Sequence, residues 1–159
     1  MVIKVGDKLP NVTFKTMSAE GPKNLTTEEA FGGKTVALFA VPGAFTPTCS
    51  ARHLPSFKEN AAAFKAKGVD TIACTSVNDV FVMAAWAKDQ SVPDMLMLAD
   101  GNGDFAKAVD LVMDGSGFGL GTRSQRYSML VKDGVVTQLN VEEPGKYEVS
   151  SGEYMLGKL

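Results

Sequence analysis

The chain has 159 residues, 45% hydrophobic and 21% charged, which is typical of one globular domain spanning residues 1–159. Its formal net charge of −2 leaves no basic surplus for phosphate contacts, so we expect no nucleic-acid partner. The polar N-terminal segment and the absence of a long apolar run predict neither a signal peptide nor a membrane span, and we expect a cytoplasmic protein.

The first predicted elements are a short helix, a buried strand and a longer helix. The spacing in Thr26-Thr27-Glu28-Glu29 is that of a capping box and predicts a helix that ends at Gly32-Gly33. The near-continuous apolar run over residues 35–40 predicts a strand buried on both faces. Residues 49–67 have apolar side chains at helical spacing, and Pro55 predicts a kink within that helix.

Strands and helices then alternate along the rest of the chain. We predict strands over residues 69–77 and 95–99, a helix from Asn78-Asp79 to Pro93, and a short helix over residues 104–109. A hairpin over residues 127–131 and 135–141 follows, and Ser150 to Glu153 caps a C-terminal helix. This order predicts an α/β protein with a mixed central sheet and helices on both faces, as in a thioredoxin-like fold.

The residues able to do metal or thiol chemistry are few. Cys49 and Cys74 lie far apart in the sequence, and His53 is the single histidine. This set is too small for a disulfide framework or a zinc site, so we expect no metal and no cofactor.

Cys49 is the candidate nucleophile. It follows the predicted strand 35–40 and begins the predicted helix, where unpaired N–H groups and the positive end of the helix dipole stabilise a thiolate. The alternative is that Cys49 merely fills space at a helix start, as a small apolar residue does. The neighbouring residues decide between these interpretations.

Those neighbours resemble a known family. Pro42-x-x-x-Thr46-x-x-Cys49, within Val41-Pro42-Gly43-Ala44-Phe45-Thr46-Pro47-Thr48-Cys49-Ser50, is similar to the active-site motif of the peroxiredoxins of the type-II, peroxiredoxin-5-like subfamily. Three further blocks resemble the same subfamily, and together they cover essentially the whole chain: His53-Leu54-Pro55, Ser76 to Trp86, and Arg126-Tyr127-Ser128-Met129 with Asp133-Gly134.

The resemblance implies a thiol-dependent peroxidase that reduces hydrogen peroxide and alkyl hydroperoxides in antioxidant defence. It implies that Cys49 forms a sulfenic acid, Thr46 supplies a hydroxyl, Arg126 is a fixed cation and Pro42 shields the pocket. A thiolate alone does not make a fast peroxidase, because nucleophilicity falls as the thiol becomes more acidic. Donors that align the peroxide and stabilise the leaving oxygen must supply the rest, and backbone N–H groups around Gly43 and Cys49 are further candidates.

His53 lies four residues after Cys49, so the two share a helical face. A Cys-His dyad is one interpretation. We favour a histidine bonded to local backbone, because Arg126 and the helix end already stabilise the thiolate. Arg52 and Arg123 are expected to be structural or surface residues.

The return of Cys49 to the thiol state has two candidate routes. Cys74 is a candidate resolving cysteine, but it falls in the predicted strand 69–77, where a buried apolar role is the alternative. We favour reduction by an external thiol, either glutathione with glutaredoxin or thioredoxin.

The resemblance also implies a homodimer. Phe45, Phe81 and Phe118 are candidate interface residues, with ordinary core packing an equal alternative. Phe45 and Phe118 are also candidate pocket residues, and the glycine-dense segment 115–121 is expected to be a flexible loop beside the pocket.

Two other functions remain open from the sequence. The first is a thiol hydrolase or transferase that uses Cys49 with His53, although no residue is evident to orient the histidine. The second is a non-catalytic thioredoxin-like redox sensor. A disulfide reductase is disfavoured, because Thr46 stands where thioredoxins have the first cysteine of their Cys-x-x-Cys motif.

Overall fold

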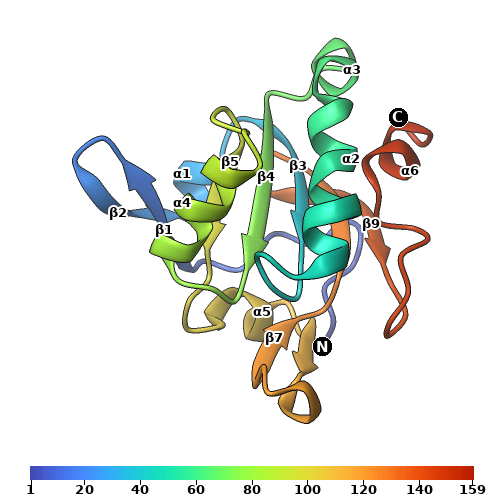
Figure 1. The fold of residues 1–159 in the computed structure, drawn as a ribbon. Helices are drawn as coiled ribbons and strands as arrows, with labels where there is room; N and C mark the ends of the chain where they lie inside the picture. The colour runs from blue at the N-terminus through green and yellow to red at the C-terminus, as the bar shows by residue number, and fades with distance from the viewer.

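The computed structural model describes residues 1–159 and has one seven-stranded mixed sheet at its centre, in the order β2-β1-β5-β4-β3-β8-β9 (Figure 1). β3 (Thr35–Ala40), β4 (Thr71–Ser76) and β5 (Leu96–Ala99) run parallel to one another. β8 (Tyr127–Lys132) runs antiparallel to β3 and forms a hairpin with β9 (Val135–Val141). The mixed sheet predicted from the sequence is confirmed.

Helices cover both faces of this sheet because successive strand residues point to opposite sides. Along β3, Leu38 packs into one apolar layer and Phe39 into the other. Four helices pack on the face of Phe39: α2 (Leu54–Glu59), α3 (Ala61–Ala66), α4 (Val80–Asp89) and α6 (Gly152–Leu156). The two that pack on the face of Leu38 are α1 (Thr27–Phe31) and α5 (Asp104–Ala108).

The helix expected over residues 49–67 consists of three pieces. It starts as a π-helical turn, η1 (Cys49–His53), in which the Leu54 N–H donates to Cys49 O, and continues as α2 and α3. Pro55 lies in the first turn of α2, immediately after the change from the π-helical turn to the α-helix. The interruption comes at Asn60, whose side-chain amide donates to Ser56 O at 2.7 Å.

Two hairpins were not predicted. β1 (Thr13–Ser18) and β2 (Gly21–Thr26) extend the sheet beyond β5. β6 (Val112–Asp114) and β7 (Thr122–Ser124) form a separate small sheet, with the short 3-10 turn η2 (Ser116–Phe118) in the connecting segment. Their strands are short or polar, so the apolar alternation that marks a strand is weak in both hairpins.

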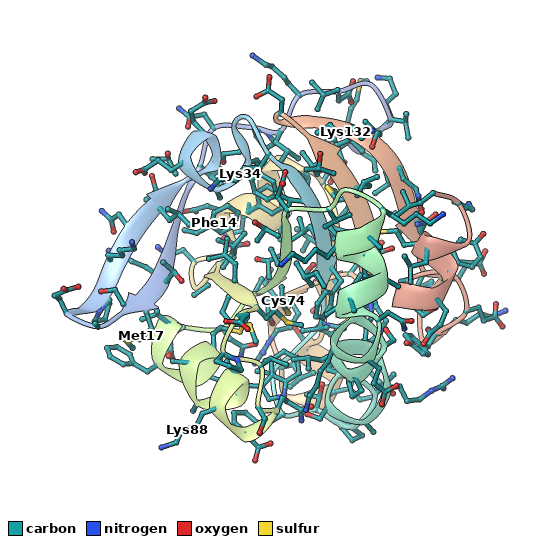
Figure 2. The ribbon with its side chains drawn as sticks, turned by 90° about the horizontal axis from the view of Figure 1, so that it is seen from above. Phe14, Met17, Lys34, Cys74, Lys88 and Lys132 are labelled. Atoms are coloured by element: carbon teal, nitrogen blue, oxygen red, sulfur yellow. The ribbon has the colours of Figure 1, made fainter.

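The predicted helix caps are confirmed where the structure shows their hydrogen bonds. Thr26 and Glu29 form the capping box of α1, the Asp79 carboxylate accepts the Val82 N–H at 2.9 Å, and the Ser151 hydroxyl accepts the Tyr154 N–H at 3.1 Å. Figure 2 shows Cys74 in the interior of the molecule, on β4 between the helices. None of the helices has the length and apolar character needed to span a bilayer.

Candidate active site

The segment between β3 and η1 is a tightly held loop, residues 41–48, which we call the thiol loop. Gly43 O accepts hydrogen bonds from the Thr46 N–H at 3.3 Å and the Thr46 hydroxyl at 2.5 Å. The Ala44 N–H donates to Asn78 Oδ1 at 3.0 Å, which ties the loop to the segment before α4. Phe45 has a left-handed φ of 65°, which is strained for a bulky residue. The loop therefore has a defined shape, and the Ser50 N–H donates to Thr46 O at 3.0 Å, which places Thr46 at the entrance to η1.

Cys49 and Arg126 meet because of the strand register. β8 pairs with β3 so that Ala40 lies opposite Tyr127, which places Arg126 at the end of β3 where the thiol loop begins. The Cys49 side chain is fully buried, and Arg126 Nη2 donates to Cys49 Sγ at 3.2 Å. A guanidinium at this distance stabilises a thiolate. The Cys49 N–H donates to none of the loop and turn carbonyls around it, so it is an available donor.

His53 is buried beside Arg126 and is neutral. Burial, and next the charge of Arg126, lower the pKa of His53 from 6.5 to about 3. Arg126 Nη1 donates to His53 Nδ1 at 2.9 Å, so the proton sits on Nε2 and is donated to Ser150 O at 2.9 Å. Both ring nitrogens are thereby occupied, which excludes a Cys-His dyad. The expected bond to local backbone is wrong in one respect, since Ser150 is distant in sequence.

An aromatic cage holds the His53 ring. Its centroid lies 5.0 Å from that of Phe39, 5.9 Å from Phe57 and 5.3 Å from Tyr147. Tyr147 belongs to the segment before α6, and its ring also faces the Arg126 guanidinium at 6.0 Å. The His53 ring itself is fully buried within this cage.

The two other arginines, Arg52 and Arg123, lie in different environments. Arg52 is exposed, and its guanidinium lies 4.5 Å from the centre of the Tyr147 ring, in keeping with the expected surface position. Arg123 is half-buried and holds the thiol loop, because it donates to Leu120 O at 3.0 Å and to Pro42 O at 3.4 Å. A side chain at position 43 would crowd the Thr46 methyl group at 3.1 Å and the Arg123 guanidinium at 3.2 Å, so glycine fits here without displacing either.

A cavity of about 620 Å³ opens beside this group. Pro42, Thr48, Phe118, Arg126 and Tyr147 are among its lining residues. Of the predicted pocket residues, Phe118 therefore lies at the cavity, whereas Phe45 does not line it and is 51% exposed. Arg126 is the member of the Cys49–Arg126 pair that lines this cavity, whereas Cys49 and Thr46 are not among its lining residues.

Cys74 lies in the middle of β4, between Phe39 on β3 and Met97 on β5. It is a fully buried free thiol (Figure 2). Burial raises the pKa of the Cys74 thiol, and the charge of Cys49 raises it further. Cys74 is therefore a protonated thiol and a poor nucleophile in the folded protein.

Sequence reasoning missed the contribution of the C-terminal segment. Tyr147 and Ser150 reach His53 only because the chain returns after β9 to pack over η1. No local motif marks either residue, so no sequence signal in a single chain could have identified them.

Comparisons with known proteins place this geometry in context. The model of the Redoxin family matches residues 4–156. The chloroplastic peroxiredoxin-2E-2 of Oryza sativa subsp. japonica is 51% identical, covering 99% of this chain and 72% of that protein. The crystal structure of reduced Prx3 from Vibrio vulnificus in complex with H2O2 has a TM-score of 0.96 and 53% identity, covering 99% of both chains. The 1-Cys peroxiredoxin of Plasmodium falciparum, described as an antioxidant protein, has a TM-score of 0.88 and 27% identity over 96% of both chains.

Proposed function

The chain belongs to the peroxiredoxins, the thiol peroxidases of the redoxin family, and from that premise we propose that Cys49 attacks the hydroperoxide and becomes a sulfenic acid. The observation that carries this assignment is the 3.2 Å contact between Arg126 Nη2 and the buried Cys49 Sγ. The other cysteine is buried in β4 and has no cationic donor on its sulfur.

The Cys49 thiolate attacks the terminal oxygen of the peroxide, an S–O bond forms and the O–O bond breaks. The attacked oxygen keeps its proton as the sulfenic acid hydroxyl. The leaving oxygen departs as hydroxide or alkoxide and takes a proton from water, and Arg126 stabilises its charge.

Thr46 has a specific part in this step. Its hydroxyl proton is donated to Gly43 O at 2.5 Å, so its oxygen faces other partners as an acceptor. It therefore accepts the O–H of the attacked peroxide oxygen and orients it, while the Cys49 N–H donates to the peroxide. Pro42 lines the cavity and limits access of water to the sulfur.

An external thiol completes the proposed cycle. A thiol R–SH condenses with the Cys49 sulfenic acid, which releases water and forms a mixed disulfide, and a second thiol then frees Cys49. The buried, protonated state of Cys74 supports this route over an internal disulfide. Glutathione with glutaredoxin, or thioredoxin, is the proposed reductant, in a reducing compartment such as the cytoplasm.

A second copy of the chain is the proposed partner. Phe45, Phe81 and Phe118 are 51%, 64% and 85% exposed, and exposed aromatic side chains on neighbouring segments favour an interface. The hydrogen bonds of Ala44 to Asn78 and of Arg123 to Pro42 tie their three segments together. The strained backbone of Phe45 also supports packing against a partner.

The test of the catalytic assignment is intact mass after one equivalent of peroxide, with and without a sulfenic-acid trap. It uses the wild type and Cys74→Ser. We expect a trapped adduct on Cys49 in both proteins. A mass loss of two hydrogens in the wild type alone would make Cys74 the resolving cysteine. No change in either protein would contradict the assignment of Cys49.

A further inference from the structure

Glu142 is a buried carboxylate without a basic partner. It follows β9 directly, is 6% exposed and takes part in neither of the salt bridges of the protein. Its Oε2 accepts the backbone N–H groups of Glu148, Val149 and Ser150 at 2.8, 2.9 and 2.9 Å, and the Ser150 hydroxyl at 2.7 Å. Burial of an anion is costly unless such bonds replace its water, so this nest fixes residues 148–150 against β9.

Ser150, which Glu142 holds, is linked to the Cys49 sulfur by hydrogen bonds through His53 and Arg126. Ser150 O accepts the His53 Nε2 proton at 2.9 Å, His53 Nδ1 accepts from Arg126 Nη1 at 2.9 Å, and Arg126 Nη2 donates to Cys49 Sγ at 3.2 Å. The backbone closes the path, because the Glu142 N–H donates to Arg126 O at 3.0 Å. Glu142, Ser150, His53 and Arg126 therefore form a closed ring of hydrogen bonds.

The bonds of this ring have a common direction. Arg126 donates to His53, His53 donates to Ser150, and Ser150 donates to Glu142. Ser150 accepts at its carbonyl and donates from its N–H, which belong to different peptide groups, so the ring transmits position through the Ser150 backbone rather than polarisation. The neutral His53 fits this arrangement, since it must donate and accept at once.

We propose that Glu142 is a positioning residue for the peroxidase reaction, which acts through Ser150 and His53 to fix the Arg126 guanidinium against Cys49. This inference rests on the proposed roles of Cys49 and Arg126. Glu142 touches no reacting atom. Its effect is orientation, because a donor that drifts from the line of the O–O bond no longer stabilises the leaving oxygen.

The test compares two reactions of Cys49 in Glu142→Gln, which keeps the size of the side chain and removes its charge. The rate constants for oxidation by hydrogen peroxide and for alkylation by iodoacetamide are measured at one pH. Both reagents consume the thiolate, so their ratio cancels the thiolate fraction, and only peroxide needs an aligned Arg126. We expect the peroxide-to-iodoacetamide ratio to fall about tenfold.

The matched control is Glu148→Gln, which removes an exposed carboxylate from the same segment. Its ratio should stay within about twofold of the wild type. Ser150→Ala removes only the hydroxyl bond to Glu142 and should lower the ratio about threefold. Circular dichroism shows whether each variant is folded. If Glu142→Gln does not fold, the ratio measured for Ser150→Ala decides the test.

A double-mutant cycle with His53→Gln tests the route of the effect. If Glu142 acts through His53, the Gln substitution at 142 should have little further effect once His53 is replaced. Additive effects, or an unchanged ratio in the folded variants at 142 and 150, would overturn the inference. A wild-type protein that peroxide does not oxidise would instead contradict the proposed role of Cys49, so the two failures are distinguishable.

Discussion

At the scale of single residues, Arg126 uses both ends of one guanidinium, Nη1 on His53 and Nη2 on Cys49. A lysine in its place retains the charge but offers one ammonium group instead of a rigid fork. We expect Arg126→Lys to lower the rate constant for oxidation of Cys49 by peroxide about 100-fold, the usual cost of removing a transition-state donor. Single-turnover stopped-flow measurements give this rate.

His53→Gln serves as the reference for that experiment. It disturbs the support of Arg126 but leaves the guanidinium in place, so its loss should be about tenfold. A larger loss in His53→Gln than in Arg126→Lys would contradict the ranking of the two residues.

His53 also makes stability depend on pH. Its pKa falls from 6.5 to about 3 on folding, so between these values the unfolded chain binds one more proton than the native protein. The free energy of unfolding therefore decreases as the pH falls through this window, by about 1.4 kcal/mol per pH unit for a full proton. Urea titrations of wild type and His53→Gln at several pH values should show a steeper decrease in the wild type, because Glu29 and Asp114, whose carboxyl pKa values are also lowered, contribute to both proteins. Parallel pH profiles for the two proteins would exclude a buried neutral His53.

The residues around the Cys49 sulfur were predicted from the sequence, but the residues that hold them in place were not. Cys49, Thr46 and Pro42 lie in one motif, and Arg126 stands in a second block of similarity, so both could be found by inspection. Glu142 and Ser150 carry no local pattern, because their roles arise only when the chain packs back over η1.

At the scale of elements, α6 packs against α2 through a glycine that has no room for a side chain. A Cβ at Gly152 would meet the Ser56 carbonyl and the Phe57 backbone. We expect Gly152→Ala to lower the free energy of unfolding by about 2 kcal/mol, as overpacking does. Gly157, at the other end of α6, has helical φ and only ordinary contacts at that position.

Gly157→Ala is the control and should change stability by less than about 0.5 kcal/mol. Chemical denaturation measures both variants. Equal effects at the two positions would show that the contact of α6 with α2 does not limit stability.

The predicted elements that were confirmed are those with strong apolar patterns or caps. The run over residues 35–40 and the hairpin after Tyr127 are examples. The π-turn at Cys49–His53 was not predicted, because it depends on how η1 packs: Trp86 of α4 donates to the Ser50 hydroxyl at 3.0 Å. Sequence periodicity cannot distinguish such a turn from an α-helix over five residues.

At the scale of the whole molecule, the order of strands and helices was enough to predict the mixed sheet, since right-handed crossovers leave few topologies. The assembly state does not follow from that order. We propose that it depends on the surface at the end of the sheet where β3 and β4 terminate and β7 lies (Figure 1).

Phe45, Phe81 and Phe118 are exposed on segments at that end. A phenylalanine that becomes buried contributes about 150–250 Å² of surface area. A stable interface buries about 800 Å² on each partner. The three phenylalanines therefore provide the apolar centre of the proposed dimer. Phe81→Asp places a charge in this centre, and we expect sedimentation velocity to show a monomer where the wild type is a dimer. Val5→Asp is the control, because Val5 is also exposed but precedes Gly6, which bonds to Val136 on β9 away from the thiol loop. Dissociation caused equally by both substitutions would contradict the proposed interface, as would a monomeric wild type.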